Sequence, residues 1–307
     1  MRVLLPVLVG PTGIGKTRVA TALAHLADIE IISADSRQVY RGLDIGTAKP
    51  VATDRAAAVY HGLDLVEPQE RYSAGRFARD ATEWIAGITA RGRLPLLVGG
   101  TGFYLRALFD GLFAEPALDP ARRARLGRVL AGLSAGELAR WAGRLDAGFK
   151  GGGAQRAART ATVALLTGRS LTGLQRGAPA APAVWTPWYA QLTLPRAALA
   201  SRIAQRTEAM LAAGLVQEVQ AVLRARVPPS APGLTGVGYR EVVQHLEGRL
   251  DDGRLAAVIA QATRRYAKRQ ETWFRHQLNG PVAALDAEKD PETLAREVLS
   301  GYRAACA

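Results

Sequence analysis

The sequence is almost devoid of cysteine: its 307 residues contain one, Cys306, which stands next to the C-terminal residue. A single cysteine excludes an internal disulfide and a zinc site built from several cysteines. Histidine is scarce as well, and none of the four lies close in sequence to another or to a serine or cysteine nucleophile pattern. We therefore interpret all four as structural or surface residues: His25, His61, His245 and His276.

Long apolar runs are also missing. No stretch reaches the ~18 apolar residues that a membrane-spanning helix requires. The chain enters its first apolar run, Val3–Val9, without the pattern of a signal peptide. Hydrophobic residues make up 48% of the chain and charged residues 22%, which is ordinary for a globular protein. These features predict a cytoplasmic protein without a membrane partner, and its length suggests two domains of ~150 residues each.

Acidic residues are too few to balance the basic ones, and the imbalance lies in one part of the chain. The net charge is +13. Residues 1–110 contain 13 Lys and Arg against 11 Asp and Glu, whereas residues 111–307 contain 27 against 16. A basic excess indicates a polyanionic partner such as nucleic acid, the plainer alternative being an Arg-rich solvated surface. The asymmetry between the two parts favours the nucleic acid.

Residues 10–17 match the phosphate-binding pattern G-x-x-x-x-G-K-[ST]. The run Val3–Val9 precedes them as a predicted buried strand, and residues 18–26 follow as a predicted helix. Glycines let backbone N–H groups point at a phosphate chain, Lys16 adds a positive charge, and the Thr17 hydroxyl can hold Mg²⁺. The sequence therefore predicts a di- or triphosphate site formed by Gly10, Pro11, Thr12, Gly13, Ile14, Gly15, Lys16 and Thr17.

Strand and helix patterns alternate along the first third of the chain. Strands are predicted over 29–33, 62–66 and 94–98, and a helix over 74–91 with Ser73 as its N-cap. Such alternation predicts an α/β fold: a P-loop NTPase-like parallel sheet flanked by helices, with ligands at the carboxyl ends of its strands. Three segments should therefore meet in one crevice: 10–17, 35–36 and 99–101.

Two of these segments each have two interpretations. Asp35, at a strand end, can be a metal ligand or general base, or it can form a helix N-cap with Ser36. Thr101 follows the tight turn Gly99-Gly100 and can donate to a phosphate oxygen, or it can cap the next helix. The residues alone leave both alternatives open.

From about Leu118 the pattern changes. Residues 120–175 are rich in Ala, Arg, Leu and Gly and have no strand-like run. Three short helices are predicted there: 120–133, 134–145 and 153–167. Residues 178–183 are typical of a linker, and residues 189–194 resemble one more strand of the sheet. We predict a catalytic core of residues 1–117 and 190–307, interrupted by a helical insertion of residues 118–189.

Two long helical patterns follow, over residues 196–225 and 254–278. The second carries six Lys and Arg against one Glu, and Trp273 and Phe274 lie near its end. A basic face beside aromatic residues suits phosphate contacts and base stacking in RNA, whereas the plain alternative is a solvated amphipathic helix. Smaller candidates for RNA contact are a basic step at 155–159 and a flexible loop with Tyr and Arg at 234–240.

Together these motifs resemble the tRNA dimethylallyltransferases, also called tRNA isopentenyltransferases, in their short bacterial form without a C-terminal zinc finger. The matching segments occur in the family's order and cover most of the chain: GPTGIGKT, SADSRQVYRGLDIGTAKP, LPLLVGGTGFYLRAL, QRAAR, TGVGYRE and AKRQETWFR. The phosphate loop alone is shared by many proteins, and the combination is what is specific. The family transfers a dimethylallyl group from its diphosphate to N6 of an adenosine next to the tRNA anticodon.

The resemblance implies a role for each matching residue. Asp35 takes a proton from the adenine amine, and Thr101 hydrogen-bonds the leaving oxygen. The phosphate loop and Arg206 hold the diphosphate, with Mg²⁺ as cofactor and Thr17 as its protein ligand. The implied partners are tRNA and dimethylallyl diphosphate, and the chain is expected to act as a monomer. The implied tRNA contacts are Asp35, Ser36, Arg37, Gln38, Thr101, Arg123, Gln155, Arg156, Arg159, Thr235, Gly236, Val237, Gly238, Tyr239, Arg240, Lys268, Arg269, Gln270, Trp273 and Arg275.

Two other functions use part of the same sequence. A P-loop small-molecule or nucleotide kinase would share residues 10–17 but gives no role to the basic C-terminal helix. A non-catalytic RNA-binding protein would use that helix but does not explain the intact Lys16, Thr17 and Asp35. An assay with unmodified tRNA and either dimethylallyl diphosphate or ATP separates the three.

Overall fold

The computed structural model describes residues 3–112, 116–176 and 185–307. The chain forms two compact units, one made of Met1–Asp110 with Ala183–Ala307 and the other of Gly111–Pro182. The first unit contains the sheet and the second contains only helices among its described residues. No helix within the described ranges is both long and apolar enough to cross a membrane.

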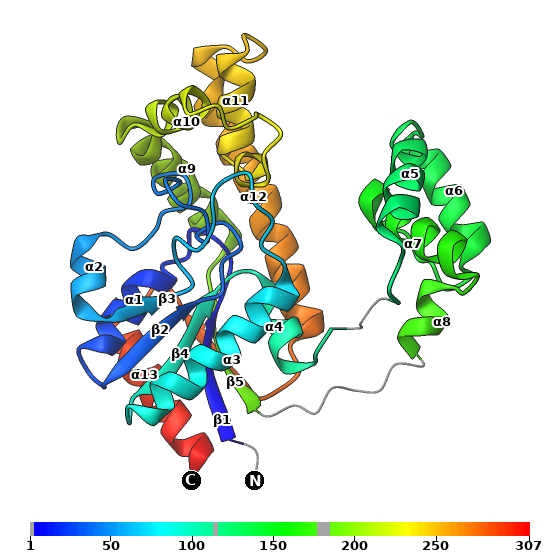
Figure 1. Ribbon diagram of the computed structural model, residues 1–307. Coiled ribbons are helices and arrows are strands. Elements are labelled where there is room, and N and C mark those ends of the chain that lie inside the picture. Colours follow the sequence, from blue (N-terminus) through cyan, green and yellow to red (C-terminus); the bar gives the residue numbers. More distant parts are fainter. Residues whose placement is uncertain (1–2, 113–115, 177–184) are drawn as a thin grey trace. The chain divides into compact units, whose positions relative to one another are not determined.

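The first unit is built on one six-stranded sheet in which every pairing is parallel (Figure 1). Its strand order is β3-β2-β4-β1-β5-β6, so the phosphate-loop strand β1 lies between β4 and β5. The parallel α/β sheet predicted from the sequence is thereby confirmed. The strands are β1 (Val3–Val9), β2 (Ile29–Ser33), β3 (Val59–His61), β4 (Leu94–Gly99), β5 (Trp185–Thr193) and β6 (Val282–Asp286).

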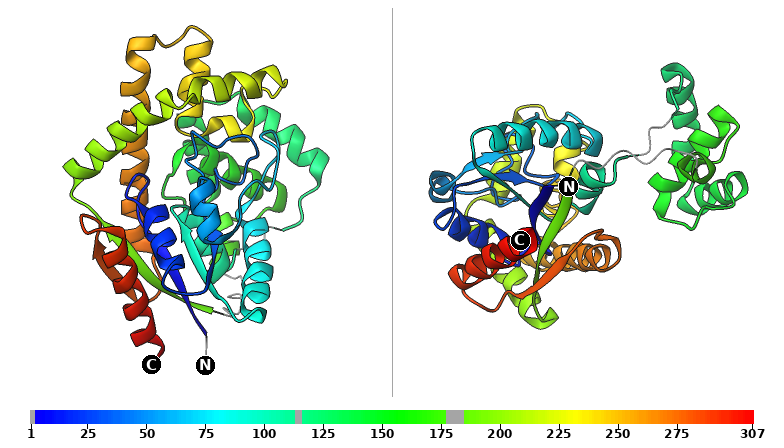
Figure 2. Two further views of the ribbon diagram at one scale, coloured as in Figure 1. Left: turned by 90° about the vertical axis from the view of Figure 1, so that its left-hand side faces the viewer. Right: turned by 90° about the horizontal axis from the view of Figure 1, so that it is seen from below.

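Consecutive residues of the central strands enter different apolar cores. Val7 and Leu97 lie in one core, Leu8 and Leu96 lie in the other, and all four are buried. Because strand side chains alternate between the two faces, a continuously apolar strand needs a helical layer on each face. Helices α1 (Lys16–Ala24) and α13 (Pro291–Cys306) pack together on one face. Figure 2 shows this pair on the side of the sheet away from α3 and α4.

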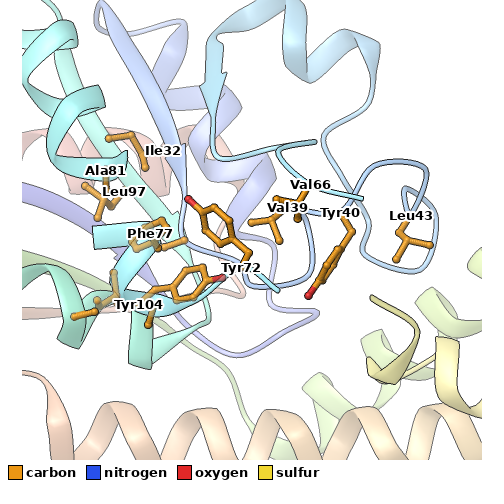
Figure 3. Close-up of a cluster of buried hydrophobic side chains, with 14 of the residues drawn as sticks. Ile32, Val39, Tyr40, Leu43, Val66, Tyr72, Phe77, Ala81, Leu97 and Tyr104 are labelled. Atoms are coloured by element: carbon orange, nitrogen blue, oxygen red, sulfur yellow. The ribbon is translucent and has the colours of Figure 1, made fainter. Parts of the chain in front are cut away.

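The opposite face is covered by α3 (Ala74–Ala90) and α4 (Gly102–Phe109). Figure 3 shows the aromatic centre of this core, where the rings of Phe77 and Tyr104 stack with centroids 4.3 Å apart. Helix α3 begins as predicted, because the Ser73 hydroxyl accepts a hydrogen bond of 3.1 Å from Arg76 N. This core supports the turn between β4 and α4, which carries Thr101.

The first unit contains further helices. The short α2 (Ala52–Ala57) lies between β2 and β3, and the others follow β5 and include the long α12 (Figure 1). Helix α12 packs against both α9 and α4. The elements are α9 (Arg196–Ala212), α10 (Leu215–Arg224), η1 (Pro232–Thr235), α11 (Tyr239–Leu246) and α12 (Asp252–Gln277).

Two predictions on secondary structure are wrong. The strand expected over 62–66 lies earlier, at Val59–His61, because the chain turns at Gly62, whose φ is +85° and whose added Cβ would lie 2.8 Å from Ser33 O. The single helix expected over 196–225 is two helices. Gly214 has a φ of +100°, which separates α9 from α10.

The second unit contains the three predicted helices and a short fourth one. Its C-terminal boundary differs from the expected insertion of residues 118–189, since Trp185–Tyr189 already pair with β1. The expected linker at 178–183 lies outside the described residues. The helices are α5 (Pro120–Ala131), α6 (Ala135–Leu145), α7 (Gly153–Thr167) and α8 (Leu171–Arg176).

A buried carboxylate near the start of β2 predicts a pH-dependent stability. Glu30 is 1% exposed and accepts hydrogen bonds of 2.9 and 2.7 Å from Arg91, with His61 Nε2 at 2.7 Å. The Arg91 hydrogen bond lowers the pKa of Glu30 to about 2, although burial opposes the shift. Because the folded-state pKa is depressed, this stabilisation is present above the unfolded pKa of ~4.3 and is lost as pH falls toward 2.

We expect Glu30→Gln to lower the free energy of unfolding at pH 7 by about 2 kcal/mol, since charge-assisted hydrogen bonds are lost. Urea unfolding at pH 7 and pH 3 measures the effect, which should shrink at the lower pH. A difference that stays the same at both pH values would show that the charge of Glu30 is not what stabilises the fold.

Candidate active site

The loop between β1 and α1 has the backbone that its glycines predict. Gly13 and Gly15 have φ angles of +83° and +107°, and helix α1 begins directly afterwards at Lys16. Gly10 is required by a close approach, because an added Cβ would lie 3.0 Å from Leu192 O of β5. The loop therefore lies at the carboxyl end of β1, beside β5, with the N-terminus of α1 at its end.

Lys16 lies within this loop. Its Nζ donates hydrogen bonds of 2.8 Å to Gly10 O and 3.0 Å to Pro11 O. Burial lowers the pKa of Lys16 to about 8; the Asp35 carboxylate opposes this decrease and the Arg206 guanidinium adds to it. A lysine so placed supplies a partly desolvated positive charge, which interacts strongly with a phosphate.

Arg206 of α9 belongs to the same electrostatic cluster. Its pKa is lowered by burial, an effect that the nearby Asp35 carboxylate opposes. Two cations and one carboxylate are thus grouped at the phosphate loop, although they come from α1, α9 and the segment after β2. The net positive charge of this cluster suits an anionic ligand.

The structure removes one of the two interpretations of Asp35. No helix begins after β2: residues 36–39 form turns, and Asp35 Oδ1 accepts a hydrogen bond of 2.8 Å from Arg37 N. Asp35 therefore closes an Asx-type turn and does not cap a helix. Its second carboxylate oxygen forms no hydrogen bond or ion pair with the part of the chain that the structure describes, and the side chain is only partly buried.

Thr101 joins two strand ends. It is the N-cap residue of α4, yet its side chain makes no capping hydrogen bond. Its Oγ1 accepts from Ser36 N at 3.0 Å and donates to Ser36 Oγ at 3.3 Å, and Thr101 N donates to Ala34 O at 3.1 Å. The hydroxyl of Thr101 therefore faces the segment that carries Asp35, and this contact joins the ends of β2 and β4.

Gln270 of α12 brings the phosphate loop to the same place. Its Oε1 accepts from Thr12 N at 2.9 Å, and its Nε2 donates to Gly100 O at 2.8 Å. Three residues on, the indole of Trp273 covers Gly102, where an added Cβ would lie 2.3 Å away. The three strand-end segments expected to share one crevice are thus joined, as the topology predicted.

The loop before α11 attaches to the segment after β2 through Arg37. Its Nη1 donates to Pro232 O at 2.8 Å and lies 3.4 Å from Thr235 Oγ1. Gly236 lies under the same side chain, since an added Cβ would be 3.3 Å from Arg37 Cδ. Thr235 and Arg240 are exposed, whereas Gly236 and Gly238 are buried. Two of the predicted RNA-contacting segments are therefore adjacent.

Three of the side chains predicted to contact tRNA form hydrogen bonds within the protein. Gln38 accepts from Ser33 Oγ at 2.8 Å and donates to Thr47 O and Ala48 O at 3.3 and 3.2 Å. The Tyr239 ring is 1% exposed, and its hydroxyl donates to Glu218 at 2.6 Å. Gln270, as described, is buried as well. These side chains therefore hold loops in place, and their contact with tRNA stays a prediction.

The exposed face of α12 agrees with the sequence pattern. Its exposed basic side chains are Arg254, Arg264, Arg265, Lys268, Arg269 and Arg275, whereas Leu255, Ile259 and Phe274 are buried. The second unit places its predicted contacts on exposed helical positions too: Arg123 on α5, and Gln155, Arg156 and Arg159 on α7. Exposed basic helices occur in both units.

Sequence reasoning missed two residues. Burial raises the pKa of Tyr266 of α12 to about 12; the Asp35 carboxylate adds to this increase, and a hydrogen bond with Thr101 opposes it. Glu218 of α10 accepts from three successive backbone N–H groups at residues 44–46, at 2.7, 2.8 and 3.2 Å. Tyr266 could have been found from its spacing, because it lies one helical turn before Gln270 and so on the same face of the helix. No local sequence pattern indicated the role of Glu218.

Comparison with known proteins gives one consistent result. A model of the family described as IPP transferase matches residues 38–277, and a model described as Isopentenyl transferase matches residues 3–58. The tRNA dimethylallyltransferase of Anaeromyxobacter sp. (strain K) is 43% identical over 299 residues, which cover 96% of this chain and 97% of the relative. That of Halorhodospira halophila is 45% identical over 280 residues, or 89% and 90% of the two chains.

Solved structures agree. The tRNA isopentenylpyrophosphate transferase from Bacillus halodurans matches with a TM-score of 0.73 at 30% identity, over 99% of this chain and 96% of that one. A eukaryotic dimethylallyltransferase acting on tRNA matches with a TM-score of 0.77 at 23% identity, over 93% and 74% of the two chains, which shows the shared fold. With a family match over most of its length and relatives above 40% identity, the chain belongs to the IPP transferase family.

Proposed function

We propose that this protein transfers a dimethylallyl group from dimethylallyl diphosphate to N6 of an adenosine next to the anticodon of a tRNA and releases diphosphate. One observation carries the proposal: a phosphate loop, a strand-end carboxylate and a strand-end hydroxyl are joined directly beneath a helix whose outer face is basic. Its curated relatives bear the name tRNA dimethylallyltransferase. A kinase would use the loop but not the basic helix.

The reaction needs a stabilised leaving group and a proton acceptor. As the adenine amine bonds to the allylic carbon, the bond from that carbon to the diphosphate oxygen breaks, and the diphosphate leaves with the bonding electron pair. Lys16 and Arg206 neutralise that anion, and the Thr101 hydroxyl donates to the departing oxygen. Asp35 accepts the proton that the amine loses. The geometry supports these roles because the four side chains come from segments that contact one another.

The residues at the loop also fit a magnesium ion. Thr17 is the second residue of α1, directly after Lys16, and the neighbouring Asp35 supplies carboxylate oxygen, the donor type that Mg²⁺ prefers. Among the described residues no group of three or more His, Cys, Asp and Glu could hold a metal, and Thr17 would be the protein ligand of the ion. When bound, the ion would add positive charge to the leaving group.

The tRNA would be held by exposed residues of both units. In the first unit these are Thr235 and Arg240 around the loop before α11, with the partly exposed Arg37 beside them, and Lys268, Arg269 and Arg275 on α12. In the second unit they are Arg123 on α5 and three residues of α7: Gln155, Arg156 and Arg159. Bringing the adenine amine to Asp35 requires the base to leave the anticodon stack, as in other enzymes that act on a base. The monomeric state and the cytoplasmic location stay predictions.

The direct test is an assay with purified protein, unmodified tRNA, Mg²⁺ and labelled dimethylallyl diphosphate. We expect label in the tRNA and release of inorganic diphosphate. A parallel reaction with labelled ATP and no dimethylallyl diphosphate tests the kinase. Transfer of phosphate from ATP, without prenylated tRNA, would contradict the proposal.

The basic face of α12 predicts a salt effect on tRNA binding. Replacing Arg264 and Lys268 by alanine removes two exposed cations, and phosphate contacts release counterions. We expect weaker binding to all tRNAs alike, with the slope of log affinity against log salt reduced by about 1 for each side chain. Titration of labelled tRNA at several salt concentrations measures both quantities.

A matched control removes the same charge elsewhere. Lys289→Ala with Arg296→Ala alters two exposed cations, one before α13 and one within it, and should leave the slope unchanged. Affinity for dimethylallyl diphosphate should stay the same in both double variants, because neither touches the phosphate loop. Equal slopes for wild type and the α12 variant would mean that this helix face is merely solvated.

A further inference from the structure

The inner face of α12 contains a polar side chain that the proposed mechanism does not use. Gln270 is 6% exposed, and both ends of its amide are bonded: Oε1 to Thr12 N at 2.9 Å and Nε2 to Gly100 O at 2.8 Å. Thr12 lies in the phosphate loop, and Gly100 immediately precedes Thr101. One amide group thus bridges two segments that are 258 and 170 residues away from it in the sequence.

The Gln270 amide lies so close to the backbone at residue 100 that this position must be glycine. A Cβ added at Gly100 would lie 2.3 Å from Gln270 Nε2, so no other residue leaves room for the amide at that position. Thr12 lies within the phosphate loop, and the hydrogen bond from its N–H to Gln270 fixes the position of the loop backbone. A buried amide with two satisfied hydrogen bonds sets an orientation that an apolar side chain of similar size does not.

The neighbouring residues of this helix face the same segments. Tyr266, one turn earlier, interacts with Thr101 and Asp35, and Trp273, three residues later, covers Gly102. Between them the outward positions Lys268 and Arg269 are exposed and basic. Residues 266–273 therefore contact the catalytic segments with one face and present cations to solvent with the other.

We propose that Gln270 is a positioning residue for the group transfer: its amide holds the phosphate loop and the Thr101 turn at the separation at which both meet one leaving group. The inference rests on the proposed function, because the proposed function places the diphosphate at the phosphate loop and pairs the departing diphosphate oxygen with the Thr101 hydroxyl. The side chain itself touches neither substrate; it acts through Thr12 and Gly100.

Gln270→Met tests this, because methionine has a similar length and makes neither hydrogen bond. We expect kcat for dimethylallyl transfer to fall about 10²-fold, the scale of a misplacement of ~1 Å in reacting groups. Affinity for inorganic diphosphate, measured by calorimetry with Mg²⁺, should fall about 10-fold, since Thr12 N loses its partner. Affinity for tRNA should stay within about 2-fold, because the exposed cations are untouched. Gln277→Met, at an exposed position of the same helix, should match wild type throughout.

Gln270→Glu adds a readout that packing alone would not change. A protonated carboxyl can accept from Thr12 N and donate to Gly100 O, as the amide does, whereas the ionised form repels the carbonyl. We expect the ratio of the variant's kcat to that of wild type to be at least ~5-fold higher at pH 6 than at pH 8.5. This measurement also replaces the first should the methionine variant not fold.

The outcomes separate the inference from the function. If wild type prenylates tRNA while Gln270→Met keeps wild-type kcat and diphosphate affinity, or the Gln270→Glu ratio is flat across pH, the positioning role is wrong. If wild type does not prenylate tRNA but Gln270→Met still weakens diphosphate binding about 10-fold, the proposed function fails and the positioning of the loop stands.

Discussion

Replacing Lys16 by alanine is expected to reduce the rate of dimethylallyl transfer by about 10³-fold, the upper range for removal of one group that stabilises a developing anion. Lys16 is partly desolvated at the start of α1, which strengthens its attraction to the diphosphate as the carbon–oxygen bond breaks. Single-turnover assays at saturating tRNA and dimethylallyl diphosphate measure the chemical step. The tRNA affinity should be largely retained, because the basic face of α12 is unchanged.

Lysine at 289 provides the control, since it is exposed and paired with Glu297, and Lys289→Ala should transfer at the wild-type rate. The pH profile gives a second measure. With its pKa lowered to about 8, Lys16 loses its charge as pH rises through that value, so kcat/KM of wild type should decline above pH 8. Near-normal transfer by Lys16→Ala would remove the phosphate loop from the mechanism.

Replacing Asp35 by asparagine should reduce transfer by about 10²–10⁴-fold if the carboxylate is the general base. The structure makes this substitution clean, because the Asn side-chain oxygen can still accept the hydrogen bond from Arg37 N that closes the turn. The fold and the position of the side chain are therefore expected to persist while proton acceptance is lost. Rate constants for wild type and variant, with melting temperatures for each, measure the two effects separately.

Asp28→Asn is the matched control, since Asp28 is exposed, is paired with Arg93 and lies at the amino end of β2, whereas the site lies at the carboxyl ends of the strands. Its rate should equal that of wild type. If Asp35→Asn transfers at a rate within a few-fold of wild type and has an unchanged melting temperature, Asp35 only closes a turn, and another group must accept the amine proton.

Much of the fold could be predicted because it depends on local pattern. The runs Val3–Val9 and 94–98 are too apolar to lie anywhere but between two helical layers, and the glycines of the phosphate loop specify a strand-to-helix turn. The rule that parallel strands end at one edge then placed the phosphate loop, Asp35 and Thr101 together, as the hydrogen bonds confirm. The two wrong predictions concern the position of β3 and the division between α9 and α10. Each depends on a single glycine with positive φ, Gly62 and Gly214.

The sequence by itself determined the phosphate loop, the parallel sheet, the basic face of α12 and the family resemblance. Each of these depends on particular residue types at short, fixed spacings along the chain. Only the tertiary structure decided what individual side chains do. Tyr239 and Gln270 share motifs with exposed residues, yet long-range packing buries them, and each joins its own segment to another. Gln38 is partly buried and joins the end of β2 to the loop at residues 47–48. A motif states which residues stand together in the chain, whereas burial and hydrogen-bond partners are set by residues that lie up to 258 positions away.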